Sequence, residues 1–417
     1  MARSFYTHKV KFFDKPFYRA DGFSTSRTAQ VTLLNTDGKV LEELYLAIPS
    51  IEEIYDNIGN NQPLNLDDCY LYGFSLTACR RYLLKDKFSR IEIKHFSAQN
   101  AFFYSGFDVD FSYATICGDS FMLSNATIVG ASFNFSDAVF KTNDVLFNDM
   151  FIKVDRMDMN RCRFEGKVIN FKNTSFSPGC KDFQDTDFGE GKVVFTNTDF
   201  GDGNVSFVNT QFNDSDVSFK VARFGEGKED FRYAKFGSGA VSFDQTDFGP
   251  GRIDFRNVEF GEGRTSFNRC QFFQGEVTFE GAQLKQGKIT FLKSTFGAQN
   301  ISFELFEGIQ ADMTFEKVIF PGSVNFSNGQ FKKLTFNRCQ FNGTLNLNVE
   351  VAQEIDLWGC ITRDIIDYYS FGESPKVDIF NITGLRLLGK LYVQWEANGI
   401  KSMIYKQRNT SIDEKAS

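Results

Sequence analysis

Phenylalanine recurs at every twelfth position through the middle of this 417-residue chain. The thirteen consecutive members are Phe171, Phe183, Phe195, Phe207, Phe219, Phe231, Phe243, Phe255, Phe267, Phe279, Phe291, Phe303 and Phe315. A second series, Phe176 to Phe272, follows five residues behind, so the intervals alternate between 5 and 7. Small or β-branched residues stand two positions before these Phe, as at Val241 and Thr246. Apolar residues at n and n+2 are typical of β-strands, so the pattern predicts a repeat of short strands.

Glycine-rich turns fill the seven-residue intervals, as at residues 189–191, 225–227 and 249–251. Glycine supplies a positive φ without steric cost, which suits it to tight turns. The middle residue is an acid in the first two turns but Pro250 in the third. We therefore interpret these segments as structural turns and not as calcium-binding loops of the β-helix type.

Upstream of residue 150 the repeat has a purer five-residue form. Phe111, Ile116 and Phe121 are five residues apart, and small residues such as Ala131 and Ala138 stand two positions before a large one. This pattern resembles the pentapeptide-repeat proteins, whose unit has a central Leu or Phe and a small residue two positions before it. The resemblance covers about residues 100–345 and implies a bacterial protein with a right-handed, quadrilateral parallel β-helix. The extra residues in alternate units depart from the family pattern and predict about 24 residues per coil, a length within the range of solenoid repeats.

A 24-residue coil makes specific predictions about side-chain columns. We expect Phe219, Phe243 and Phe267 to stack on one inner face. Phe212, Phe236 and Phe260 should stack on another. On the outside, the expected vertical neighbours are Asp199, Arg223 and Asp247 in one column and Lys235 and Glu259 in a second. A 12-residue coil is less favourable, because its cross-section would be too small for the inward rings, given that packed sheets lie ~10 Å apart.

The flanking regions do not follow the repeat and are expected to be caps. Residues 1–100 predict a hairpin over 31–46, with its turn at Thr36-Asp37-Gly38, and a short helix that starts at a capping box beginning with Ser50. Residues 101–345 are the expected β-helix. Residues 346–417 are expected to form a C-terminal cap, with a closing helix over 395–407 and a polar tail. Because no natural helix stop follows, we expect the natural chain to continue beyond Ser417.

Few residues could carry catalysis. The chain has only 2 His, His8 and His95, and its 8 Cys contain no CxxC pair. We expect buried thiols in a reducing compartment, with no catalytic, cofactor-binding or metal-binding residues. A row of hydroxyl residues just before the first Phe series could form a flat ladder that binds an ordered surface such as ice. We interpret it instead as outward strand positions filled by β-compatible residues.

The sequence favours a cytoplasmic, non-enzymatic scaffold or protein-interaction module whose partner is unknown. The resemblance implies an alternative, an acidic rod that mimics DNA and binds a type II topoisomerase. Residues 131–345 hold 28 acids and 25 bases, however, far below the charge density of a duplex. A further alternative is the soluble region of a larger membrane-associated protein, although no run of 18 apolar residues exists. We expect no direct nucleic-acid binding and, by resemblance, a homodimer through the 345–410 end.

Overall fold

The computed structural model describes residues 5–297, 300–368 and 377–393, which fall into two compact units, residues 1–205 and 206–417. In each unit the chain forms a parallel β-solenoid, and the two units together hold about 12 coils whose strands lie about 24 residues apart. This confirms the predicted fold class, including the non-repeat ends and the short helices.

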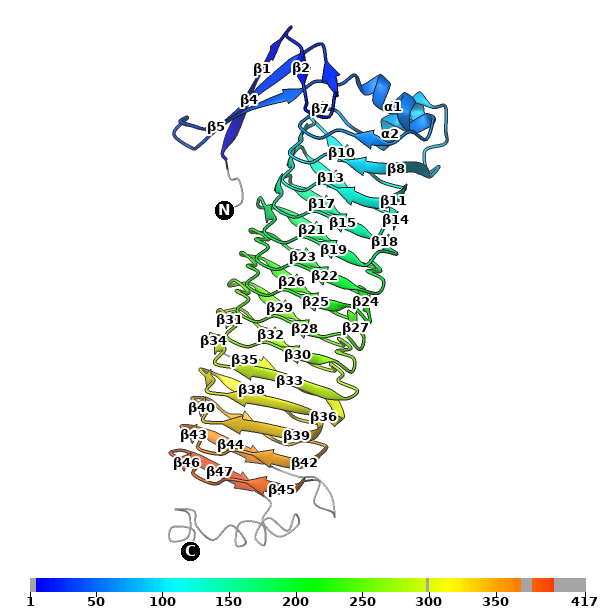
Figure 1. The fold of residues 1–417 in the computed structure, drawn as a ribbon. Helices are drawn as coiled ribbons and strands as arrows, with labels where there is room; N and C mark the ends of the chain where they lie inside the picture. Colours follow the sequence, from blue (N-terminus) through cyan, green and yellow to red (C-terminus); the bar gives the residue numbers. More distant parts are fainter. Residues whose placement is uncertain (1–4, 298–299, 369–376, 394–417) are drawn as a thin grey trace, which may run out of the picture. The chain divides into compact units, whose positions relative to one another are not determined.

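The coils of the first unit have four sides, most of them built from one short strand (Figure 1). A single coil contains β13 (Ser132–Asn134), β14 (Val139–Lys141), β15 (Asp144–Leu146) and β16 (Phe151–Lys153). The remaining strands of these columns are β6 (Leu64–Asn65), β7 (Tyr70–Tyr72), β8 (Ile91–Ser97), β9 (Phe102–Tyr104), β10 (Asp108–Asp110), β11 (Ala114–Met122), β12 (Thr127–Val129), β17 (Arg156–Asp158), β18 (Arg163–Phe164), β19 (Val168–Asn170), β20 (Ser175–Phe176), β21 (Cys180–Asp182) and β22 (Lys192–Val194). Each strand pairs in parallel with its equivalents in adjacent coils, as predicted for stacked repeats.

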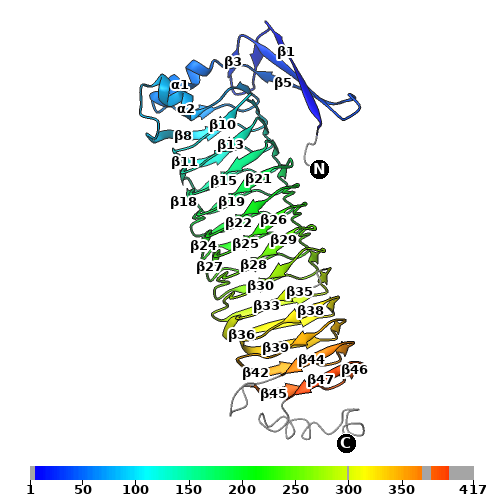
Figure 2. The same cartoon turned by 180° about the vertical axis from the view of Figure 1, so that it is seen from behind.

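Three columns of strands run through the second unit (Figure 2). The first contains β26 (Lys228–Asp230), β29 (Arg252–Asp254), β32 (Val277–Thr278), β35 (Asn300–Ser302), β38 (Ser323–Asn325), β41 (Leu345–Asn346), β44 (Ile365–Tyr368) and β47 (Lys390–Val393). The second contains β25 (Asp216–Ser218), β28 (Val241–Ser242), β30 (Arg264–Ser266), β33 (Gly287–Leu292), β36 (Glu307–Glu316), β39 (Gln330–Asn337), β42 (Val351–Asp356) and β45 (Val377–Asn381). The third contains β31 (Gln271–Phe272), β34 (Thr295–Phe296), β37 (Ile319–Phe320), β40 (Gln340–Phe341), β43 (Ile361–Thr362) and β46 (Arg386–Leu387), and the fourth side has the pair β24 (Gln211–Asn213) and β27 (Lys235–Phe236).

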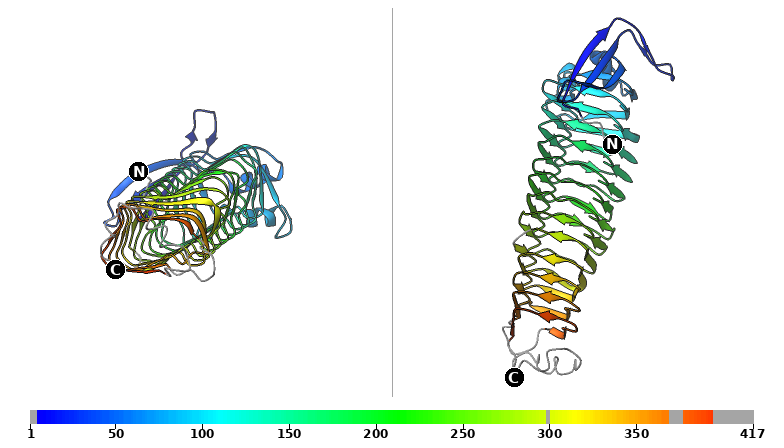
Figure 3. Two further views of the ribbon diagram at one scale, coloured as in Figure 1. Left: turned by 90° about the horizontal axis from the view of Figure 1, so that it is seen from below. Right: turned by 90° about the vertical axis from the view of Figure 1, so that its left-hand side faces the viewer.

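The aromatic core has the predicted 24-residue step. Phe243 stacks on Phe219 at 4.9 Å between ring centroids and on Phe267 at 4.7 Å, with rings parallel to within 2°. Phe236 stacks in the same way between Phe212 and Phe260, at 4.6 Å and 5.9 Å. Seen from below, successive coils of this unit repeat a similar outline, each offset from the next (Figure 3). Offset or edge contacts between rings stabilise by about 0.5–1.5 kcal/mol beyond burial, so the column favours one register.

Ring contacts within a coil are different from those between coils. Phe231 meets Phe243 edge-on, at 5.8 Å and 85°, and does not lie beneath it. A 12-residue coil would place the two rings in one column, so this contact excludes it. The outer columns also have the 24-residue step. Arg223 pairs with Asp247 in a parallel backbone β-bridge, and the Lys235 side chain forms an ion pair of 2.8 Å with Glu259.

The glycine turns stack closely from coil to coil. A Cβ added to Gly251 would lie 1.5 Å from the carbonyl oxygen of Gly227, and one on Gly275 would lie 1.5 Å from that of Gly251. No L side chain can be accommodated at such a distance. The glycines are therefore required by the approach of backbone to backbone, which supports the interpretation of these segments as structural turns.

The parallel stack extends past the expected repeat limits of 101 and 345. At the C-terminal side, Leu345 pairs with Ile366, a step of 21, and Ile366 pairs with Leu391, a step of 25. At the N-terminal side, Tyr70 pairs with Phe102, a step of 32. Coils of unequal length break the fixed Phe spacing without breaking the strand pairing. Strands of the solenoid type therefore also occur within both expected caps.

The N-terminal region holds the predicted hairpin and the predicted short helix. β4 (Thr28–Leu34) pairs antiparallel with β5 (Val40–Ala47), and β1 (Thr7–Phe13) pairs with the other side of β4. A two-stranded ribbon follows β1, formed by β2 (Phe17–Tyr18) and β3 (Ser24–Thr25). Helix α1 (Ile51–Gly59) begins at Ser50, whose hydroxyl accepts from the Glu53 amide as predicted. A second helix, α2 (Leu76–Tyr82), was not predicted. The expected helix over 395–407 lies outside the described residues.

Candidate binding groove

The N-terminal sheet packs on outward side chains of the first unit. Phe102 in β9 and Phe151 in β16 point away from the coil interior, yet are only 0% and 6% exposed. The cluster that covers them comprises Phe5, Ala29, Val31, Leu33, Leu46 and Tyr70. Full burial of a Phe side chain stabilises by about 1.5–3 kcal/mol, so these two rings hold the sheet against the column β7–β9–β12–β16.

An aromatic groove of about 580 Å³ lies beside this contact. Its lining comprises Thr7, His8, Val10, Phe12, Arg27, Ile48, Tyr70, Tyr72 and Tyr104. β1 supplies one wall, and the ends of β7 and β9 supply the other. Phe12 is 49% exposed and Tyr72 is 65% exposed, so their rings remain open to a ligand.

The rings of the groove support one another. Phe12 lies 5.6 Å from Tyr70, Tyr72 lies 5.9 Å from Tyr104, and the His8 ring lies 4.9 Å from Tyr104. The Arg27 guanidinium stands over Phe12 at 5.6 Å and forms an ion pair of 3.2 Å with Asp14. These contacts hold the aromatic faces in place before any ligand arrives, which reduces the entropy lost on binding.

The groove offers hydrogen-bond donors and lacks carboxylates among its described lining residues. Burial raises the pKa of Tyr70 to about 12, so its hydroxyl stays neutral and can donate. Burial, and then the nearby Lys153 ammonium, lower the pKa of His8 from its ordinary value. His8 is therefore an uncharged ring at neutral pH.

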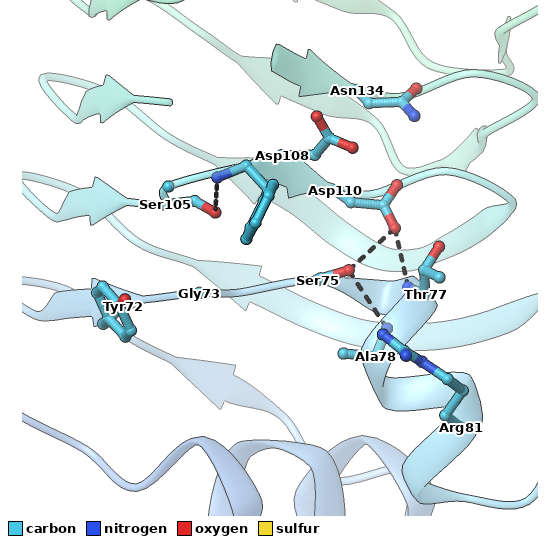
Figure 4. Close-up of a pocket in the computed structure, with 12 residues that line it drawn as sticks. Tyr72, Gly73, Ser75, Thr77, Ala78, Arg81, Ser105, Asp108, Asp110 and Asn134 are labelled. Carbon is cyan, nitrogen blue, oxygen red and sulfur yellow. Dashed lines mark hydrogen bonds between the residues drawn. The ribbon is translucent and has the colours of Figure 1, made fainter. Parts of the chain in front are cut away.

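A polar hollow of about 510 Å³ beside helix α2 is explained by helix capping (Figure 4). The Asp110 carboxylate accepts from the Thr77 amide at 2.8 Å and from the Ser75 hydroxyl at 3.3 Å. Ser75 is the N-cap residue, and its own oxygen accepts from the Ala78 amide. The converging polar groups satisfy the first turn of α2, and we assign them no catalytic role.

The remaining titratable groups of interest are dispersed. His95 is exposed on β8, away from the groove residues. No three His, Cys, Asp or Glu side chains in the described part of the chain are grouped as metal ligands. All eight thiols are free; Cys180 is exposed, Cys117 is half-buried and the other six are buried. The row of hydroxyl residues is divided between two columns of strands, for example Ser242 in β28 and Thr278 in β32, so it does not form one flat ladder.

Two inward positions carry ionisable residues that the sequence analysis missed. Glu229 is fully buried in β26, where the next coils have Ile253 and Val277, and neither carboxyl oxygen has a hydrogen-bond partner among the described residues. Burial raises the pKa of Glu229 to about 9, so the carboxyl is protonated at neutral pH. In the first unit, Lys181 donates to the carbonyl oxygens of Gly179 and Asp202, and burial lowers its pKa to about 8. Glu229 and Lys181 each stand two residues before a repeat Phe, where most coils have an apolar residue. This departure from the pattern is the signal that could have identified them.

The aromatic groove was also missed from sequence. Its residues come from strands with no common period, and the available signal was weak. Phe102 and Phe151 put aromatic rings at outward positions that are polar in most coils, which indicates that something covers them. No family model, curated protein or solved structure matches this chain.

Proposed function

We propose that this protein is a non-enzymatic interaction module whose N-terminal aromatic groove binds a proline-rich segment of a protein partner. The observation that carries the proposal is the pre-arranged shelf of Phe12, Tyr70, Tyr72 and Tyr104. Aromatic-lined grooves recognise polyproline II segments, which are already extended and therefore lose little entropy on binding.

The polar chemistry of the groove supports this occupant. Proline has no backbone N–H, so a proline-rich segment presents carbonyl acceptors and few donors. The groove presents tyrosine hydroxyls, the Thr7 hydroxyl and the Arg27 guanidinium, with no carboxylate in its described lining. A groove that offers donors and has no carboxylate in its described lining complements such a segment.

The test is titration of a fluorescent proline-rich decapeptide into the full chain. Tyr72→Ala should weaken binding at least tenfold if Tyr72 is a hot spot of the interface, since hot-spot residues, among which Tyr is enriched, contribute about 2 kcal/mol or more. Tyr18→Ala is the matched control, because Tyr18 is 76% exposed on the same unit and lies outside the groove. The proposal fails if the peptide does not bind, or if both substitutions weaken it equally.

The other functional expectations stay proposals. Membership of the pentapeptide-repeat family is supported by the stacked four-sided coils. A topoisomerase-binding DNA mimic ranks second, because carboxylates on the β26–β29 column are neutralised: Asp254 lies close to Arg252 and Arg256, at 3.7 Å and 2.7 Å. In the described part of the chain, no helix combines the length and apolar content that crossing a membrane requires. The proposed homodimer involves the 345–410 region, part of which lies outside the described residues.

A further inference from the structure

One corner of the second unit carries a row of residues in the left-handed conformation. It lies where the β30–β33–β36–β39 column turns into the β31–β34–β37–β40 column. Successive coils place there Val221, Gln245, Arg269, Lys293, Lys317, Arg338, Gly359 and Gly384, all with φ between 54° and 69°. The Lys293 amide donates to the carbonyl of Glu316, which precedes Lys317, and the Lys317 amide donates to that of Asn337, which precedes Arg338. These backbone hydrogen bonds place Lys293, Lys317 and Arg338 at the same corner in three successive coils, which we call rungs.

Four consecutive rungs are cationic, and we call Arg269, Lys293, Lys317 and Arg338 the cationic ladder. Strands stack at ~4.8 Å, and like charges ~5 Å apart repel by ~0.8 kcal/mol even in water. All four side chains are exposed. Lys317 has one ion pair, with Glu316 at 3.3 Å, and Arg338 stands over Trp358 at 4.9 Å. Arg269 and Lys293 have no ion pair within the described residues.

The turn conformation does not require these cations. Asparagine and glycine are the residues that favour a left-handed φ. The other left-handed corner of this unit carries no cation in its described rungs Tyr233, Asn257, Gly281, Leu305 and Asn328. The ladder therefore combines a less favoured backbone conformation with like-charge repulsion, and neither stabilises the coil.

A groove of about 560 Å³ opens along the lower part of the ladder. Lys317, Arg338 and Arg386 line it together with Ile319, Gln340 and Ile361. In the next two coils the same corner position is held by Gly359 and Gly384, whose lack of a side chain leaves the corner open. The outward residues of β31, β34, β37, β40, β43 and β46 are Gln271, Thr295, Ile319, Gln340, Ile361 and Arg386, without an acid. This face is cationic although the whole chain has a net charge of −7.

We propose that the cationic ladder and its groove bind a linear polyanion, a chain of phosphate groups extended along successive rungs. A line of cations beside a hollow fits a narrow chain better than it fits a flat anionic bilayer. Inorganic polyphosphate and the backbone of a single-stranded nucleic acid share this chemistry. Arginine and lysine bind phosphate oxygens through charge-assisted hydrogen bonds, which are about twice as strong as neutral ones.

The experiment titrates three labelled probes into the full chain at several salt concentrations: inorganic polyphosphate, oligo-dT and vesicles containing phosphatidylserine. The ladder variant is R269Q/K293Q/K317Q/R338Q. It should bind polyphosphate or oligo-dT at least tenfold more weakly. The slope of log K against log salt should also fall by about 2–3 units, at ~0.7 per lost contact on a single strand. Polyphosphate binding alone would identify a free phosphate chain, and oligo-dT binding alone a nucleic acid; both support the proposal.

The control variant K220Q/K285Q/K288Q/K332Q removes the same charge from exposed lysines outside the ladder. It should change affinity less than twofold. The variant R269K/R338K keeps the charge and should retain binding, which separates a lost site from a disturbed fold; thermal unfolding of each variant checks the fold directly. Equal losses in the ladder and control variants, binding to vesicles alone, or no binding to polyphosphate and oligo-dT would overturn the proposal.

Discussion

The hydroxyl of Thr246 donates a hydrogen bond of 2.8 Å to the backbone carbonyl oxygen of Phe219, in the preceding coil. The thiol of Cys270 makes the equivalent bond to Phe243 at 2.9 Å, and the hydroxyl of Ser294 makes it to Phe267. Where the residue two positions before a Phe of the second series is Thr, Ser or Cys, it therefore does more than leave room for the ring. It links two coils through a side-chain donor, and this explains why Thr, Ser and Cys recur there.

Thr246→Val should lower the free energy of unfolding by about 0.5–1.5 kcal/mol, since the shape is kept and one intramolecular hydrogen bond is lost. Thr246→Ser keeps the donor and should lie closer to the parent protein. Urea unfolding followed by circular dichroism measures both. If the Val variant were as stable as the parent protein, the hydrogen bond would contribute nothing.

Phe243→Ala should cost about 3–5 kcal/mol, because it removes a fully buried ring that contacts both adjacent coils. Phe273→Ala is the control, since Phe273 is 40% exposed, and its cost should stay below about 1.5 kcal/mol. The same unfolding experiment compares the two. Similar losses would show that the ladder of rings is not the main source of stability.

Glu229 should make stability fall as pH rises. Burial raises its folded pKa to about 9, above the unfolded value near 4.5. The contribution is therefore fully present below pH 4.5 and is lost as pH approaches and passes about 9. Glu229→Gln should flatten the pH dependence of the unfolding midpoint across this window, whereas the exposed Glu280→Gln should not. An unchanged profile in Glu229→Gln would contradict a buried, protonated carboxyl.

Lys181 should act with the opposite sign. Its folded pKa is lowered to about 8 from 10.5, so its contribution is present above pH 10.5 and is lost as pH falls through about 8. Lys181→Met should flatten this part of the stability profile, which differential scanning calorimetry between pH 6 and pH 10 can follow. The exposed Lys192→Met is a suitable control. A profile in Lys181→Met that matches the parent protein would exclude the effect.

Thiol labelling should distinguish the eight cysteines under native conditions. Cys180 is exposed and should react first with a thiol reagent, Cys117 more slowly, and the six buried thiols only on unfolding. Burial raises the pKa of Cys162 and of Cys270, which further lowers the thiolate fraction that reacts. Mass spectrometry after brief labelling identifies the sites. Early modification of Cys270 would show that the coil opens readily.

The solenoid could be predicted from sequence because the coil length is written directly in the Phe spacing. Phe219 and Phe243 share a column that leaves out Phe231 only if a coil spans about 24 residues, and four sides follow from the two alternating intervals. The aromatic groove could not be predicted, since Phe12 and Tyr70 meet only after the N-terminal sheet folds over the coils. Arg269, Lys293 and Lys317 are 24 residues apart, so the predicted coil length already places them in one column, whereas Arg338 follows Lys317 by 21 residues and joins that column only in the structure.

Each coil is hydrogen-bonded to the coils before and after it at a fixed step, as where Val241 pairs with both Val217 and Thr265. A gene encoding such a unit can therefore lengthen or shorten by whole coils, since a duplicated block of one coil returns every Phe to its column. A single inserted codon inside a strand would instead turn the following Phe outward. Evolution of length in this protein is thus expected to proceed in steps of one turn, with intermediate lengths confined to the corners, as where Leu345 already reaches its partner Ile366 by a shorter step.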